Sequence, residues 1–395
     1  MSSPTARRIE PAAILACAGL AFLGWAGLLV PSLIRSIEPA FGQDDAGVGV
    51  FFFVNAVASV GGSIGGGLLT ERIGRRVVLT VAFALMAIGL AALATVPTWT
   101  LFLVAAIPIG FGFGAIDGGM NGLVLDLYPE GRGRALNLLH LSFSLGALAS
   151  PLFVGRIVDA GVDWQAVIIG SAVAAVPMAV LFAVIRLPSG RHEHTPGVSA
   201  VRTGLALPLI LLAVAIACYV GSEIGVSNWL VRYLEAASLT LATSALALFW
   251  ACLALGRLVS ARLGDRFDHA WFAATCSVAA AGALVAAVLV PSLPVSIVLF
   301  GVVGFAFGPV YPLIVAVAGD RYPARSAAVT GFLSGTAVIG AIVYPPVMGF
   351  VSVGAGLGAA MLGAAALVLA CGIVLAAVAR RPATARADNA ETAVR

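Results

Sequence analysis

Long apolar stretches alternate with short polar turns along almost the whole chain. The apolar stretches cover residues 11–36, 47–70, 76–96, 99–128, 133–157, 164–187, 204–234, 240–263, 270–290, 294–319, 325–352 and 355–379. A helix of about 20 apolar residues crosses the hydrocarbon core of a bilayer, so each stretch is long enough for one span. Because lipid offers no hydrogen-bond partner to an open backbone, the pattern predicts twelve membrane-spanning helices.

The composition agrees with this pattern and excludes other classes of protein. Of 395 residues, 61% are apolar and 10% are charged, whereas a soluble domain carries about 25% charged residues. The five cysteines lie inside apolar stretches without the spacing of a zinc site or a disulfide framework, so we expect no metal. The sequence contains no nucleotide-binding loop, nucleophile elbow or haem motif, which predicts no cofactor and argues against an enzyme or an ATP-driven pump.

The positions of the basic residues predict the orientation in the membrane. All 22 basic residues are arginines. If the N-terminus is cytoplasmic, nineteen of them, including Arg257, fall on the cytoplasmic side, and only Arg35, Arg156 and Arg232 fall outside. Cytoplasmic loops are enriched in arginine in this way, so we expect a multi-pass protein of the inner membrane with both termini in the cytoplasm. The scattered net charge of +4 favours lipid contact over a nucleic-acid partner, and we expect a monomer.

An internal repeat divides the chain into two halves. Equivalent residues recur 194 positions apart, as 322 − 128 shows for the two Tyr-Pro pairs. The repeated pairs are Tyr128 and Tyr322, Asp126 and Asp320, Gly110 and Gly304, Gly114 and Gly308, Gly146 and Gly340, Pro151 and Pro345, and Gly155 and Gly349. The repeat predicts six-helix bundles at 1–187 and 204–380, a cytoplasmic linker at 188–203 and a cytoplasmic tail at 381–395.

The turn after the second span reads Gly67-Leu-Leu-Thr-Glu71-Arg72-Ile-Gly74-Arg75-Arg76, and part of it recurs as Asp265-Arg266. This turn resembles the signature loop of the major facilitator superfamily, with Glu71 where that family usually has aspartate. The resemblance implies an all-α membrane protein with twelve transmembrane helices in two pseudo-symmetric six-helix bundles, the major facilitator fold. In the second copy, Asp268 and His269 replace the glycine and the arginine of the pattern.

An acid beside basic residues at a helix end can cap a neighbouring helix and latch the cytoplasmic side. We therefore expect a cytoplasmic gate formed by Gly67, Glu71, Arg72, Gly74, Arg75, Arg76, Asp265 and Arg266.

A second resemblance lies inside the predicted spans. The segments Gly110-x-Gly-x-Gly-x-x-Asp117-x-x-x-Asn121 and Asn137-Leu-Leu-His140 resemble spans four and five of the fucose:proton symporter family, and Tyr219-Val-Gly resembles a segment of its span seven. The resemblance implies a proton-coupled sugar permease. The fucose transporter itself has an acid in its first span, whereas residues 14–34 of this chain contain none, which argues against fucose as the solute.

Two acids, Asp117 and Glu223, lie well inside the predicted spans. Asp117 precedes Tyr128, the end of the fourth span, by eleven residues, which places it about 16 Å deep, near the bilayer midplane. A charged aspartate at that depth costs about 2.5–3.5 kcal/mol on insertion scales, so the carboxyl is suited to take up and release a proton. We expect Asp117 and Glu223 to couple protons to transport. The alternatives are a carboxylate that holds two helices together at Asp117 and an ion pair with a nearby arginine at Glu223.

Polar and aromatic residues near these acids are the candidates for solute contact. Asn121 lies one turn from Asp117 on the same helix face, and Gly114 and Gly118 leave room beside it for a neighbouring helix or a ligand. His140 is placed to bond the acid or a solute hydroxyl, or to pack between helices. The candidate solute-binding residues are Asn121, Asn137, His140, Tyr219, Asn228, Trp229, Trp250 and Tyr311. Tyr311 is the repeat equivalent of Asp117, so proton chemistry is expected in one half only.

These features predict a secondary active transporter that imports a small polar solute, a monosaccharide, together with a proton, with sodium as the alternative coupling ion. The site is expected at the midplane between the halves, which would rock to give alternating access. The alternative is a proton-coupled exporter of drugs or metabolites, which often has a Gly-Pro motif in span five that Gly146, Ser150 and Pro151 match loosely. A membrane sensor would need a larger soluble domain than the chain provides.

Overall fold

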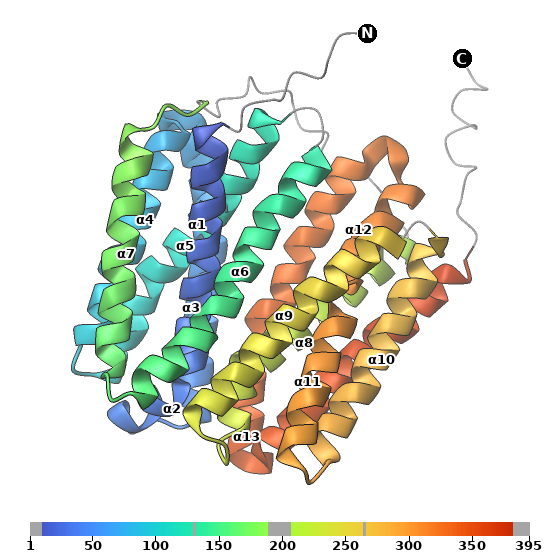
Figure 1. Ribbon diagram of the computed structural model, residues 1–395. Coiled ribbons are helices and arrows are strands. Elements are labelled where there is room, and N and C mark those ends of the chain that lie inside the picture. Colours follow the sequence, from blue (N-terminus) through green and yellow to red (C-terminus); the bar gives the residue numbers. More distant parts are fainter. Residues whose placement is uncertain (1–9, 129–131, 189–206, 264–265, 382–395) are drawn as a thin grey trace. The chain divides into compact units, whose positions relative to one another are not determined.

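The computed structural model describes residues 10–128, 132–188, 207–263 and 266–381, and this part of the chain is helical without strands. Its helices, seen in Figure 1, are α1 (Pro11–Gly27), α2 (Leu29–Phe41), α3 (Asp45–Ile73), α4 (Arg75–Thr95), α5 (Trp99–Leu127), α6 (Arg132–Asp159), α7 (Trp164–Val184), α8 (Leu207–Tyr233), α9 (Leu239–Leu263), α10 (His269–Leu289), α11 (Leu293–Phe307), α12 (Val310–Arg321) and α13 (Ser326–Ala379). The predicted all-α fold class is confirmed.

Eleven helical stretches in the described part are long and apolar enough to cross a membrane. The last of them, Val329–Ala379, has 51 residues, more than twice the length of one span. The backbone leaves helical geometry at Gly356, where φ is 79° and ψ is 157°, so α13 consists of two helices joined at that glycine. Two crossings in α13 bring the total to the predicted twelve.

The first span is longer than its apolar pattern indicates. The stretch from Pro11 to Phe41 is helical except for a break at Leu28, between α1 and α2, and it forms one candidate span of 31 residues. The predicted end at residue 36 is therefore too early. Helix α2 ends at Gly42, whose φ of 60° lies in the left-handed region that favours glycine. This extension places Glu38 inside a candidate span.

By their contacts, the described residues fall into two compact units. The first unit is drawn from residues 1–195, 228–251 and 349–354, and the second from residues 196–227, 252–348 and 355–395. In the first unit α3 packs along α5, α4 contacts α5 and α7, and α1 packs along α6 (Figure 1). In the second unit α10 packs against α11 and α12. The two predicted bundles, 1–187 and 204–380, remain a prediction. Most of the linker and tail, residues 189–203 and 382–395, lies outside the described residues.

The repeat of 194 residues is visible in how helices cross within each unit. At two pairs of glycines that are 194 positions apart, an added Cβ would lie between 1.8 and 2.4 Å from a backbone oxygen of the neighbouring helix, a distance no real Cβ adopts. These contacts join Gly62 to Phe111 and Gly114 to Ser59 in the first unit, and Gly256 to Phe305 and Gly308 to Leu253 in the second. Both members of each contact shift by 194 positions, so α3 and α5 cross as α9 crosses the α11–α12 stretch. Small residues allow this close helix packing in membranes.

Candidate functional site

Asp117 and Asn121 lie on one face of α5, as the spacing predicts. The Asn121 side-chain amide donates to Asp117 Oδ1 at 3.2 Å and to the Asp117 backbone carbonyl at 2.9 Å. Both side chains are half-buried. The pair is therefore formed within a single helix, four residues apart, and its geometry follows from helical periodicity.

The glycines beside Asp117 have different surroundings. A Cβ on Gly114 would lie 1.8 Å from the Ser59 carbonyl oxygen, so α3 fills the space at this position. Gly118 is exposed, and a Cβ there would have Ser63 Oγ as its nearest neighbour at 3.4 Å. The predicted room beside the acid is therefore taken by a helix at Gly114 and remains open at Gly118.

Asn137 and His140 lie on α6, and both are exposed. His140 is in contact with other residues of the protein. Its backbone carbonyl accepts a hydrogen bond from the Ser144 hydroxyl at 3.1 Å. In the second unit the Tyr311 hydroxyl lies 3.3 Å from Ser334 Oγ. Subtracting 194 converts 311 to 117 and 334 to 140. The repeat equivalents of Asp117 and His140 thus form a hydrogen-bonded pair in the second unit.

Glu223 is paired with an arginine, which is the arrangement that the sequence left as the alternative. Arg257 Nη2 lies 3.5 Å from Glu223 Oε1, and the two side chains are 32% and 7% exposed. Arg257 lies inside α9, within the predicted span 240–263. A buried carboxylate needs such a partner because the low dielectric of the interior penalises an unpaired charge.

The aromatic candidates are largely packed inside the protein. The Tyr219 ring is fully buried, and its hydroxyl donates to the Phe307 carbonyl at 3.0 Å. Trp229 is also fully buried, with its ring centroid 5.6 Å from that of Phe52, and Trp250 is 4% exposed. Tyr219, Trp229 and Trp250 therefore expose little or no ring surface to a solute in this conformation, whereas Asn228 and Tyr311 are half-buried. Solute binding by these residues remains a prediction.

In the predicted gate motif, Arg75 is the buried residue. Its side chain is 4% exposed, and its Nη1 lies 2.7 Å from Asp126 Oδ2 at the end of α5. Gly74 separates α3 from α4 with φ of 90°, in the region that favours glycine. The remaining described motif residues, which are Gly67, Glu71, Arg72, Arg76 and Arg266, are exposed, and Asp265 lies outside the described residues.

The second copy of the motif keeps the contact to the aspartate, with a histidine in place of the arginine. His269 Nδ1 lies 2.8 Å from Asp320 Oδ2, and 269 − 75 and 320 − 126 both equal 194. In place of the glycine, Asp268 caps α10 by accepting from the Trp271 backbone N–H at 2.8 Å. His269 therefore takes the place of Arg75. The constant offset of 194 residues leads from Arg75–Asp126 to His269–Asp320, but the comparison of the motif sequences alone missed this pairing.

A cluster of charged residues that the sequence did not indicate lies at the junction of α2 and α3. Arg232 Nε, on α8, is 2.8 Å from Glu38 Oε2 and 2.9 Å from Asp45 Oδ1. The Ser352 hydroxyl, on α13, donates to Asp45 Oδ2 at 2.6 Å. We call Glu38, Asp45, Arg232 and Ser352 the Glu38 cluster. All four residues belong to the first unit.

The Glu38 cluster adds two buried acids near helix ends to the two acids predicted well inside the spans. Glu38 and Asp45 are 7% and 8% exposed, and both begin or end helices. A sequence signal for the cluster did exist: Arg35 and Arg232 are two of the three arginines that break the predicted orientation rule. In the structure Arg35 bonds to the Ala237 carbonyl after α8, and Arg232 contacts Glu38 on α2 and Asp45 on α3.

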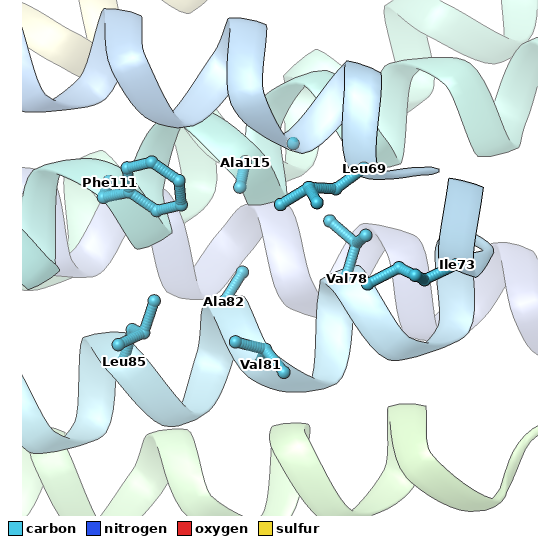
Figure 2. Close-up of a pocket in the computed structure, with 9 residues that line it drawn as sticks. Leu69, Ile73, Val78, Val81, Ala82, Leu85, Phe111 and Ala115 are labelled. Atoms are coloured by element: carbon cyan, nitrogen blue, oxygen red, sulfur yellow. The ribbon is translucent and has the colours of Figure 1, made fainter. Parts of the chain in front are cut away.

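Figure 2 shows a surface hollow between α3, α4 and α5 that is lined by apolar side chains, among them Leu69, Val81 and Phe111. It offers no polar group to a solute, so it is not the candidate site. Within the described residues, no group of three or more His, Cys, Asp or Glu side chains is placed to hold a metal ion.

These features define the class of the protein, which is a multi-pass membrane protein of the transporter type. They are the twelve apolar helix crossings, the repeated glycine contacts and the acids held within the helices. The family model described as Major Facilitator Superfamily matches residues 14–236 and 205–394. The chain belongs to the Major Facilitator Superfamily. Members of this family are transporters and not enzymes, in agreement with the sequence analysis.

Individual curated relatives match a smaller part of the chain than the family model does. The sodium-dependent glucose transporter 1 of Rattus norvegicus is 30% identical over 126 residues, which are 32% of this chain and 25% of that protein. The chain thus matches about a quarter of the length of this relative.

Two solved structures share the fold over nearly the whole chain. A bacterial homologue of the human lysosomal transporter Spinster, in an inward-facing and occupied conformation, has a TM-score of 0.78 at 14% identity and covers 93% of this chain and 96% of its own. The fucose:proton symporter of E. coli has a TM-score of 0.63 at 20% identity and covers 93% and 98%. These likenesses establish the major facilitator fold.

Proposed function

We propose that the protein is a secondary active transporter that imports a small polar solute, a monosaccharide, together with a proton by alternating access. The name of the rat relative supports a sugar as the solute, and the name of the E. coli structure supports coupling to protons. The partners of the protein are then a small-molecule solute, protons and the lipid bilayer. Sodium is the alternative coupling ion, and the rat relative is named for it.

The observation that carries the proposal is the pair of Asp117 and Asn121 on α5. The carboxyl lies about 16 Å from the end of the span, close to the depth of the bilayer midplane. It is hydrogen-bonded at 3.2 Å to an amide and has no arginine partner among the ion pairs of the described residues, unlike Glu223. An acid that is not neutralised by a fixed cation is free to exchange a proton, and Asp117 is therefore the proton carrier in this proposal.

His140 and the exposed face at Gly118 complete the proposed site in the first unit. In the second unit, Tyr311 and Ser334 are bonded at the two equivalent positions, which supports an approach of His140 to Asp117 when the solute site forms. Asn121, Asn137 and His140 would supply hydrogen bonds to solute hydroxyls, since binding sites orient a polar ligand with a few placed polar groups.

The arrangement in the membrane follows from the arginine pattern. Nineteen of 22 arginines share one side when both termini are cytoplasmic. In this orientation α3 begins on the outer side and the Gly67 to Arg76 turn is cytoplasmic, so the Arg75–Asp126 pair would stabilise the cytoplasmic ends of α4 and α5. We propose the inner membrane as the location and a monomer as the functional form.

Solute uptake by the protein in proteoliposomes tests the proposal. The solute is first identified by a thermal-stability screen with sugars, amino acids and lipophilic cations at two pH values. A ligand at 100 times its Kd raises apparent stability by about 2.7 kcal/mol. Shifts with lipophilic cations and none with any sugar would contradict the sugar proposal and support the exporter.

The Asp117→Asn variant then tests the coupling ion. It keeps the shape and the amide contact of the side chain but cannot carry a proton. We expect it to bind the solute and exchange it across the membrane, but to lose accumulation driven by a pH gradient. Asp320→Asn, which alters an acid that is 67% exposed, is the control and should accumulate solute normally. Accumulation by Asp117→Asn with unchanged pH dependence would remove Asp117 from the mechanism.

A further inference from the structure

The Glu38 cluster contains more buried negative charge than positive charge. Glu38 and Asp45 share the single guanidinium of Arg232, at 2.8 and 2.9 Å from its Nε. Asp45 is fully bonded, because its second oxygen accepts from Ser352 at 2.6 Å. Glu38 Oε1 is buried and has no hydrogen-bond partner, in a side chain that is 9% exposed.

The other charged groups around Glu38 do not supply the missing cation. Arg35, on the same helix, donates hydrogen bonds from Nη1 to the Ala237 carbonyl at 2.9 Å and from Nη2 to the Glu235 carbonyl at 3.0 Å. The Glu235 carboxylate pairs with Arg232 from an exposed position and adds further negative charge. Asp44 caps α3, and Asp159 accepts from the Thr240 N–H at 2.8 Å. A deprotonated Glu38 would leave its buried Oε1 lone pairs and one negative charge without compensation.

We propose that Glu38 is a proton-binding site: the proton resides on its buried carboxyl group, and the Glu38 cluster as seen in the structure is the protonated form. The step is the addition of one proton from water to the carboxylate, with no other bond made or broken. Binding at Glu38 stands on this geometry alone. Its role in transport rests on the proposed function, in which Asp117 carries the coupled proton.

The proton at Glu38 controls how tightly the ends of α2, α3, α8 and α13 are held together. A Cβ on Gly349 would lie 2.4 Å from the Asp45 carbonyl oxygen, so α13 meets the start of α3 backbone to backbone. A Cβ on Gly155 would lie 1.9 Å from Thr243 Oγ1, which shows an equally close contact between α6 and α9. The Glu38 side chain is itself only 9% exposed, so a charged carboxylate there would be poorly hydrated. Loss of the proton therefore favours separation of these helix ends, which form the outer side in the proposed orientation.

Infrared spectroscopy of the full-length protein in lipid tests the binding site directly, because a protonated carboxyl has a C=O band distinct from that of a carboxylate. We expect a protonated-carboxyl band at neutral pH, of which one component is lost in Glu38→Gln. The same component should persist in Glu235→Gln, the matched control with an exposed side chain. An unchanged band in Glu38→Gln overturns the proposal. So does a band that disappears on addition of sodium at constant pH, because the occupant would then be a metal cation.

A distance measurement tests the consequence for the helix ends. Spin labels at the exposed residues Ala40 and Ala236 report on the separation of α2 from the end of α8. Raising the pH should lengthen this distance in the parent chain, whereas Glu38→Gln, which resembles the protonated form, should keep it short at every pH. The same pH response in Glu38→Gln and in the parent would contradict the proposal. Asp117→Asn should retain the pH response, so a failure of Asp117 as the proton carrier is distinguishable from a failure of Glu38.

Discussion

The two equivalent pairs, Arg75–Asp126 and His269–Asp320, predict an unequal response to the same substitution. Arg75 is 4% exposed and pairs with Asp126, which is 21% exposed; His269 is 24% exposed and pairs with Asp320, which is 67% exposed. Asp126→Asn and Asp320→Asn remove one negative charge at equivalent positions of the repeat. The first leaves a buried guanidinium without its carboxylate partner, whereas the second leaves a group that water can solvate.

The exposed fractions give the magnitudes. Breaking a buried ion pair by removing one partner costs about 3–5 kcal/mol, and the partial exposure of Asp126 places its loss near the lower end, about 3 kcal/mol. An exposed pair contributes about 0–1 kcal/mol, so Asp320→Asn should cost about 0.5 kcal/mol. The difference of about 2.5 kcal/mol corresponds to roughly 60-fold in an equilibrium constant.

Thermal unfolding of the purified protein, followed by tryptophan fluorescence at one heating rate, measures this difference. A single heating rate is needed because the apparent midpoint of an irreversible transition depends on it. We expect the midpoint of Asp126→Asn to fall clearly below that of the parent, and that of Asp320→Asn to stay close to it. Equal losses in the two variants would refute the reasoning from burial.

Two further substitutions test the packing of the first unit by the same measurement. Gly114→Ala should lower the apparent stability by about 1–3 kcal/mol, because its Cβ would lie 1.8 Å from the Ser59 carbonyl oxygen. The control Gly67→Ala places a Cβ that meets nothing within 4 Å, so it should not lower the stability. Equal effects of the two substitutions would argue against the α3–α5 contact. Trp25→Phe should cost about 1 kcal/mol, since the indole donates to Ser171 Oγ at 2.9 Å; a midpoint unchanged from the parent would show that this bond adds no stability.

Much of the fold was predictable because its causes are local. A span requires a run of apolar residues, and the composition of that run is visible in the sequence. Asp117 and Asn121 share a face because they are four residues apart on one helix. The repeat of 194 positions also marked glycines such as Gly114 and Gly308, where α3 and α9 cross their partners.

The first span shows where the local signal ends. Its apolar pattern weakens after residue 36, but the helix continues to Phe41, and the buried Glu38 in this extension is paired with Arg232 on another helix. The arginine pattern gave Arg257 only a side of the membrane, whereas the structure pairs it, inside α9, with Glu223. In both cases an amino acid that is unfavourable in lipid is stabilised by a residue elsewhere in the chain.

The sequence by itself determined the number of spans, the repeat, the family signature and the Asp117–Asn121 pair, since each depends on neighbours within one helix or on a constant offset. Only the tertiary structure decided which charges meet. Asp45 and Ser352 are 307 residues apart in the chain and yet hydrogen-bonded. Helical periodicity fixes the face on which a side chain lies, but the partner of that face is chosen by packing between helices, so the Glu38 cluster became visible only in the folded chain.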